Sequence, residues 1–130
     1  MTYSWVDHTA ELELRIEAPS AEDVFADALA AFAELVGTGQ GKTRRHELSL
    51  GASDHAGLLA LWLEELVYLA ETDDFVPDRA AELRLADDEL HAVVEGRRGS
   101  PPHLVKAVTY HGLTMHPEGD GWKARLVLDV

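Results

Sequence analysis

The spacing of the apolar residues changes along this chain, and the change limits the folds open to it. Residues 20–36 and 54–72 carry apolar side chains three and four positions apart, which predicts two amphipathic helices. Beyond residue 72 the spacing becomes two, the period of strands with one buried face. Shorter alternating segments precede the first helix (residues 12–17) and separate the helices (47–50). Helices and strands in this order predict an α+β domain.

The second half of the chain alternates between strand patterns and turn residues. Residues 83–85 and 90–94 flank a pair of aspartates and predict a hairpin, and RRGSPPH (97–103) predicts a loop. Residues 104–116 and 122–130 predict two more strands, joined by the turn PEGDG. We therefore expect two amphipathic helices packed on one face of a largely antiparallel β-sheet. A single domain should span residues 1–130, because no linker or repeat divides them.

Residues that cap helices mark both predicted helices. Ser20, followed three residues later by Asp23, is the expected N-cap of the first helix. Gly37 is expected to end this helix in a left-handed backbone conformation. Ser53 or Asp54 should cap the second helix.

Composition excludes several kinds of chemistry. The chain has no cysteine, so it has neither disulfides nor a thiolate metal site. Asp and Glu outnumber Lys and Arg by 24 to 11, and a net charge of −13 disfavours direct nucleic-acid binding. The same excess suits a divalent cation, a basic protein partner, or solubility alone. No apolar run reaches the ~20 residues needed to cross a bilayer and no signal peptide is evident, so we expect a cytoplasmic protein without membrane association.

Carboxylates lie at both ends of the predicted sheet. Glu11 begins the first alternating strand, just after Asp7 and His8, and Asp129 and Val130 end the sequence. If the first and last strands are antiparallel neighbours, Glu11 lies near Asp129 and the terminal carboxylate. Carboxylates this close repel one another unless a cation compensates, and hard oxygen ligands suit Ca²⁺ or Mg²⁺. The residues alone leave a solvated pair of carboxylates as the alternative, with His8 as a weaker ligand, a hydrogen-bond donor to a ligand, or neither.

Other polar residues allow more than one interpretation. His111, in VKAVTYHGL, either approaches the acidic residues or is satisfied by the backbone, and Lys106 either balances acid, contacts a partner's phosphates, or is simply exposed. The basic clusters at 44–46 and 97–98 are expected in loops. GTGQGK lacks the spacing of a phosphate-binding loop, and no arrangement of serine, histidine and acid compels hydrolase chemistry.

Five segments in succession resemble those of one known family. DHTAELELRI, SAEDVFADALAAFAELV, LLALWLEELVYLAETDDFV, VKAVTYHGL and the terminal LDV are similar to motifs of the archease family. The resemblance runs in order from about Tyr3 to Val130. It implies an accessory protein, not an enzyme, whose partner is an RtcB-type RNA ligase. Family members promote guanylylation and multiple turnover of that ligase in tRNA splicing or RNA repair.

The resemblance also implies a metal site. Carried over by position, its ligands are Glu11, Asp129 and the main-chain oxygen of Val130. The implied cofactor is a divalent cation, Ca²⁺ before Mg²⁺ or Mn²⁺. The family commonly has Asp where this chain has Glu11, and the extra methylene moves the carboxylate by roughly 1.5 Å. The site is then either kept with altered affinity, since Ca²⁺ tolerates variable geometry, or lost.

Four further residues are candidates to orient a ligand or to face the partner: Asp7, His8, Lys106 and His111. Two rival functions remain at this level. One is a stand-alone metal-dependent hydrolase that uses Glu11, Asp129 and His8 with a metal-bound water. The other is a general chaperone-like protein-binding module. The sequence gives no indication of oligomeric state.

Overall fold

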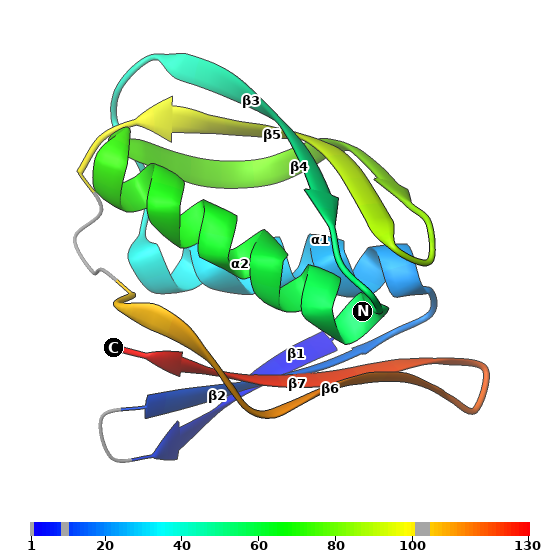
Figure 1. Ribbon diagram of the computed structural model, residues 1–130. Coiled ribbons are helices and arrows are strands. Elements are labelled where there is room, and N and C mark those ends of the chain that lie inside the picture. Colours follow the sequence, from blue (N-terminus) through cyan, green and yellow to red (C-terminus); the bar gives the residue numbers. More distant parts are fainter. Residues whose placement is uncertain (1, 9–10, 101–104) are drawn as a thin grey trace.

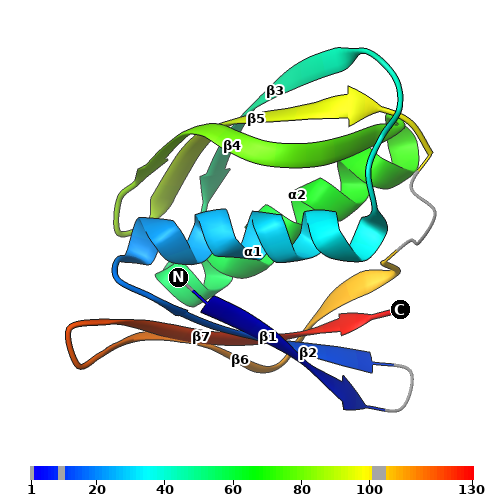
Figure 2. The same ribbon diagram turned by 180° about the vertical axis from the view of Figure 1, so that it is seen from behind.

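Two helices lie between two antiparallel sheets in the computed structural model of the chain, which gives three layers (Figures 1 and 2). The structure describes residues 2–8, 11–100 and 105–130, with residues 7 and 8 described by their backbone. In chain order the elements are β1 (Thr2–His8), β2 (Glu11–Ala18), α1 (Ala21–Val36), β3 (Thr43–Gly51), α2 (His55–Thr72), β4 (Phe75–Leu85), β5 (Glu89–Arg98), β6 (Ala107–Glu118) and β7 (Gly121–Asp129). The four-stranded sheet has the order β1-β2-β7-β6, and the three-stranded sheet has the order β3-β5-β4.

The predicted helices and their caps are confirmed. The Ser20 hydroxyl accepts a hydrogen bond from the Asp23 N–H at 3.1 Å, which satisfies one free donor of the first turn of α1. Gly37 ends α1 with φ +95°, a value that favours glycine. Of the two candidates for the second cap it is Asp54 that acts, since its Oδ1 accepts from the Gly57 N–H at 2.8 Å.

The α+β class and the antiparallel pairing are confirmed, but the strands divide into two sheets where one was expected. The reason lies in the helices, whose apolar surfaces are wide enough to need a cover on both sides. The first helix packs on β2 of one sheet and β4 of the other, and the second packs on β6 and β4. Strand periodicity shows that one face is buried, but it does not show which strands share a sheet.

Several strands are longer than expected, and one was missed. Residues 2–8 form β1, although their sequence TYSWVDH did not stand out as a strand. The third strand begins at Thr43, so Arg44, Arg45 and His46 lie in a strand, and the prediction of a loop there was wrong. Arg97 and Arg98 belong to β5, which corrects the start of the predicted 97–103 loop; residues 101–104 lie outside the described part. Pairing of β3 with β5 holds these basic residues in strands, because backbone hydrogen bonds form whatever the side-chain charge.

The prediction that the first and last strands are antiparallel neighbours is confirmed for β2 and β7. These strands pair antiparallel with Glu11 opposite Asp129 and Ala18 opposite Trp122. Figure 1 shows the C-terminal end of β7 beside the start of β2. Preceding β2, strand β1 pairs along its other edge, with His8 opposite Glu11. Strands from the two ends of the sequence therefore pair within one sheet.

The core fills the space between the sheets. Trp62 of α2 is fully buried, and its Nε1–H donates to the Phe25 carbonyl oxygen of α1 at 2.9 Å. This bond joins the two helices and satisfies the one polar atom of the indole. No helix in residues 2–8, 11–100 or 105–130 combines the length and apolar content needed to cross a membrane.

We predict that Leu63→Ala lowers the free energy of unfolding by about 2–5 kcal/mol, because Leu63 is fully buried between the layers and its truncation leaves a cavity. Chemical denaturation would measure this loss. Glu71→Ala, an exposed change on the same helix, should alter stability by about 0.5 kcal/mol or less. Equal effects of the two substitutions would contradict the layered core.

Candidate functional site

The outer face of the four-stranded sheet, which points away from the helices, carries most of its charged side chains. In β2 the buried Leu14 and Ile16 face the core and alternate with charged residues. β7 follows the same rule, with Leu126 and Leu128 in the core. Cross-strand partners in an antiparallel pair point to the same side of the sheet. The following charged residues of β2 and β7 therefore share the outer face: Glu11, Glu13, Arg15, Glu17, Lys123, Arg125 and Asp129.

One end of this face brings the predicted metal-site residues together. His8 pairs with Glu11, Glu11 with Asp129, and Asp129 with Ala107, so a single row crosses all four strands. We call these four positions the terminal row. The Lys106 N–H donates to the Asp129 main-chain oxygen at 2.8 Å, which fixes the start of β6 against the end of β7.

The two carboxylates of the terminal row lie in a repulsive arrangement. Directly opposed residues place their Cβ atoms about 5 Å apart, and like charges there destabilise the sheet. Both side chains are half-buried. Within the described residues, neither carboxylate has a hydrogen bond or ion pair with another side chain. A cation is the simplest counterpart for such a pair.

The donor set of the terminal row fits a hard divalent cation in part. Two carboxylates and main-chain oxygens are ligands that suit Ca²⁺, which accepts six to eight oxygens. Among the residues that the structure describes, no three histidine, aspartate or glutamate side chains are grouped to hold a metal. An ion at Glu11 and Asp129 would therefore need further oxygens from the main chain at Val130, from water, or from a partner.

The other predicted residues have different placements. Val130 follows β7 and is 39% exposed. Lys106 is exposed beside the terminal row. His111 is exposed in the stretch of β6 between Thr109 and Thr114, where the register with β7 shifts, so the pairing does not bring it into the row.

The predicted roles of Asp7 and His8 rest on their side chains, which lie outside the described part. Their backbone positions pair with Leu12 and Glu11. His8 thus holds the β1 position of the terminal row, and its role stays a prediction.

A second cluster on the outer face was missed by sequence reasoning. Glu13 is only 1% exposed and is ion-paired with Arg15 and with Arg125, whose Nη2 lies 2.7 Å from Glu13 Oε1. The hydrogen bond from Arg125 lowers the pKa of Glu13 from about 4.5 to about 2, burial opposes this shift, and the bond from Arg15 adds to it. The register would have revealed the cluster, because counting by twos from the Glu11–Asp129 pair places Arg15 opposite Arg125.

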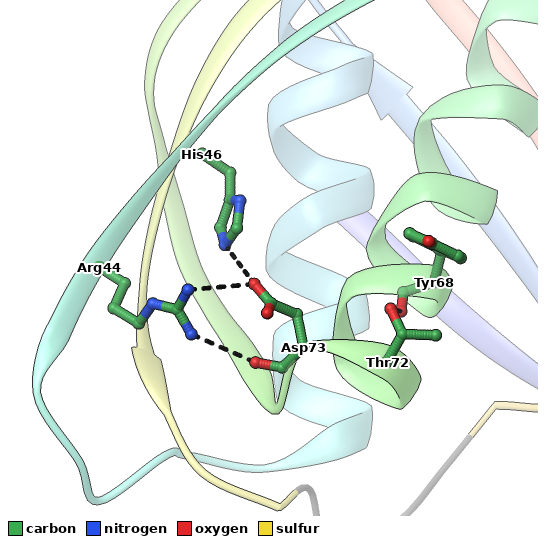
Figure 3. Close-up of polar contacts among 5 residues, drawn as sticks. All are labelled: Arg44, His46, Tyr68, Thr72 and Asp73. Carbon is green, nitrogen blue, oxygen red and sulfur yellow. Dashed lines mark hydrogen bonds and ion pairs between the residues drawn. The ribbon is translucent and has the colours of Figure 1, made fainter.

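The basic residues of β3 have a structural role at the end of α2 (Figure 3). Arg44 donates through Nη1 to the Asp73 main-chain oxygen at 3.3 Å and through Nη2 to Asp73 Oδ2 at 3.1 Å. His46 Nε2 lies 3.1 Å from the same Oδ2. These contacts tie the C-terminal end of the helix to the three-stranded sheet, so Arg44 and His46 are already engaged within the fold.

The layered fold and its charged outer face define a small acidic α+β domain, and comparison with known proteins gives its family. The sequence model of the Archease protein family (MTH1598/TM1083) matches residues 3–130. The chain therefore belongs to the archease family.

Relatives and solved structures agree with this assignment. The chain is 36% identical to protein archease of Methanosarcina acetivorans and 34% identical to that of Methanosarcina mazei, in each case over 98% of this chain and 95% of the relative. The solution structure of Methanobacterium thermoautotrophicum protein 1598 is similar with a TM-score of 0.72 and 27% identity, over 98% of both chains. A crystal structure from Thermotoga maritima, described as an archease and possible chaperone, shares the fold with a TM-score of 0.69 at 21% identity, over 100% of this chain and 98% of that one.

The depressed pKa of Glu13 gives a test in acid. Its folded pKa of about 2 lies below the ordinary value of 4.5, so its stabilisation is complete above pH 4.5 and is lost as the pH falls toward 2. Between about pH 5 and pH 2, the wild type should lose on the order of 2 kcal/mol more unfolding free energy than Glu13→Gln, a value reduced for the exposed arginines.

Urea titrations across this pH range would measure the difference. Glu82→Gln, which removes an exposed strand carboxylate from the other sheet, is the matched control and should keep the wild-type slope. Parallel pH profiles for wild type and Glu13→Gln would show that the arginines do not hold Glu13 in its charged form.

Proposed function

We propose that this chain is a non-catalytic activator of an RtcB-type RNA ligase, promoting guanylylation and multiple turnover of that enzyme in tRNA splicing or RNA repair. The observation that carries the proposal is the convergence of Glu11 and Asp129 from the two ends of the sequence. These are the positions at which the motifs of the archease family imply a metal site. Membership of that family supports the rest.

The terminal row is the proposed cation site. Glu11, Asp129 and the main-chain oxygen of Val130 would hold a divalent cation, Ca²⁺ before Mg²⁺ or Mn²⁺. Bound there, the ion would neutralise the two carboxylates and offer its remaining positions to oxygens of a partner or its nucleotide. Lys106, exposed next to the row, would face the partner, and Asp7, His8 and His111 remain candidates to orient a ligand or to contact the partner.

Charge favours a protein partner over a nucleic acid. A ligase that binds GTP and RNA must present positive charge near its active site, and a chain with net charge −13 is drawn to such a surface. Attraction of this kind speeds the encounter and weakens with salt. We place this encounter in the cytoplasm, where an RNA ligase would meet its substrates.

A chaperone-like binding role is the second candidate, favoured by one observation: the Thermotoga maritima protein of the same fold is described as a possible chaperone. The two roles differ in selectivity. An activator raises the turnover of one ligase, whereas a general chaperone protects unrelated proteins from aggregation. A stand-alone hydrolase has no comparable observation in its favour.

We expect the chain to raise multiple-turnover joining of RNA by its cognate ligase in the presence of GTP and a divalent cation. Glu11→Gln and Asp129→Asn should each reduce this stimulation at least about tenfold, the size of effect that follows from losing one charged ligand. Glu82→Gln removes the same charge from the other sheet and should stimulate like the wild type.

Thermal melting would confirm that these variants stay folded. Full stimulation by both Glu11→Gln and Asp129→Asn would exclude the terminal row from the function. A wild-type protein that leaves the ligase unchanged but suppresses aggregation of unrelated proteins would favour the chaperone role.

We also expect that the isolated chain does not retain tRNA in a gel-shift experiment at physiological salt, because its net charge repels the phosphate backbone. The ligase, tested alongside, is the positive control. Tight and salt-sensitive retention of tRNA by the chain alone would contradict this prediction.

A further inference from the structure

A hollow of about 510 Å³ opens on the outer face of the four-stranded sheet, away from the terminal row. Residues from all four strands line it. They form two rows, each made of residues that lie opposite one another across the strands. The first row is Ser4, Arg15, Arg125 and Thr114, and the second is Thr2, Glu17, Lys123 and His116. We call these eight positions the basic hollow.

Seven of the eight positions of the basic hollow carry hydrogen-bond donors. Two arginines, one lysine, one histidine and three hydroxyl groups point to this side of the sheet, and Glu17 is the one carboxylate in its lining. Glu17 is ion-paired with Lys123, at 3.4 Å between Oε1 and Nζ. Such a donor-rich surface contrasts with the net charge of −13 of the whole chain. Lys123 is also ion-paired with Glu118, at 3.1 Å, so the donors left for an oxyanion are chiefly the N–H groups of the two arginines.

The two arginines carry more charge than their shared partner balances. Arg15 and Arg125 are directly opposed on neighbouring strands, an arrangement that is repulsive by itself. Both are ion-paired with the single buried carboxylate of Glu13, through Nε of Arg15 and Nη2 of Arg125. Their side chains remain 58% and 45% exposed. Among these three side chains, two guanidinium groups and one carboxylate leave one positive charge, while Lys123 is balanced by carboxylates of its own.

The fold holds these guanidinium groups in place before any ligand arrives. Glu13 anchors both from within the sheet. Gly112, with φ +71°, lies where the register of β6 shifts, and a Cβ there would be only 3.2 Å from Arg125 Nη1. The guanidinium of Arg125 therefore lies against bare backbone. Groups fixed in this way lose little entropy when they bind a ligand.

We propose that the basic hollow binds a phosphate group, either as inorganic phosphate or as part of a nucleoside phosphate. Paired arginines match the geometry of phosphate oxygens, and a hollow of 510 Å³ lies within the usual size range of small-molecule sites. The proposal does not depend on the ligase. Four residues of strand separate Arg15 from Glu11, roughly 14 Å, so the hollow is distinct from the proposed cation site.

Titration of the whole chain with inorganic phosphate, and separately with GTP, tests the proposal at constant ionic strength set with chloride. Amide NMR shifts should move in β2 and β7 near Arg15 and Arg125, with little change near Glu11 and Asp129. Arg125→Gln and Arg15→Gln should each weaken phosphate binding at least about tenfold, as expected for the loss of a charged hydrogen bond.

Arg79→Gln is the matched control, because it removes one exposed arginine that is ion-paired on the three-stranded sheet, and it should keep phosphate affinity within about twofold. Loss of an arginine could also unsettle the buried Glu13. Thr114→Val and Ser4→Ala therefore serve as a second pair of variants that change no charge and leave both ion pairs of Glu13 intact, and each should weaken phosphate binding at least about threefold.

Tighter binding of GTP than of phosphate would identify a nucleoside phosphate as the ligand, and equal binding would identify free phosphate. Absence of any shift at millimolar phosphate would overturn the proposal. So would equal affinity of the wild type and all four hollow variants. Since ligase stimulation is not measured here, this outcome is independent of the proposed function.

Discussion

The register between β2 and β7 is the constraint on which the outer face depends. It sets Glu11 against Asp129 at one end and Arg15 against Arg125 further along. Because successive side chains point to opposite faces, a slip of one residue would turn these charges into the core and bring Leu14 and Leu126 into water. The cost of burying such charges makes the register strongly specified. Apolar packing on one face of the sheet thereby fixes the geometry of the polar groups on the other.

Much of the fold could be predicted because its signals are local. The helix boundaries follow from Ser20, Asp54 and Gly37, which act on neighbouring backbone groups. Pairing of the first and last strands near Glu11 and Asp129 was also within reach, since their alternation defines a buried side. The division of the strands into two sheets could not be predicted, because it depends on how much apolar helix surface must be covered. The basic first part of β3, residues 43–46, was assigned to a loop for a similar reason, since its partner residues in β5 lie about fifty positions further along the chain.

The two clusters of the outer face differ in how far the sequence predicts them. Glu11 and Asp129 stand out because they lie at the ends of the chain and within family motifs. Glu13, Arg15 and Arg125 look like the ordinary solvated half of two alternating strands. Only the burial of Glu13, at 1% exposure, sets them apart. One of its two partners, Arg125, comes from β7, which no pattern within β2 reveals.

The outer face of the four-stranded sheet therefore has an electrical polarity that the net charge conceals. Its negative end lies at the terminal row and its positive groups about 14 Å away, a span longer than the ~8 Å over which physiological salt screens exposed charges. A large charged surface approaching this face would feel a torque as well as an attraction. The molecule would therefore become oriented before contact. Its net charge governs the rate of encounter with a partner, and the placement of Glu13 and the arginines governs its orientation in the encounter complex.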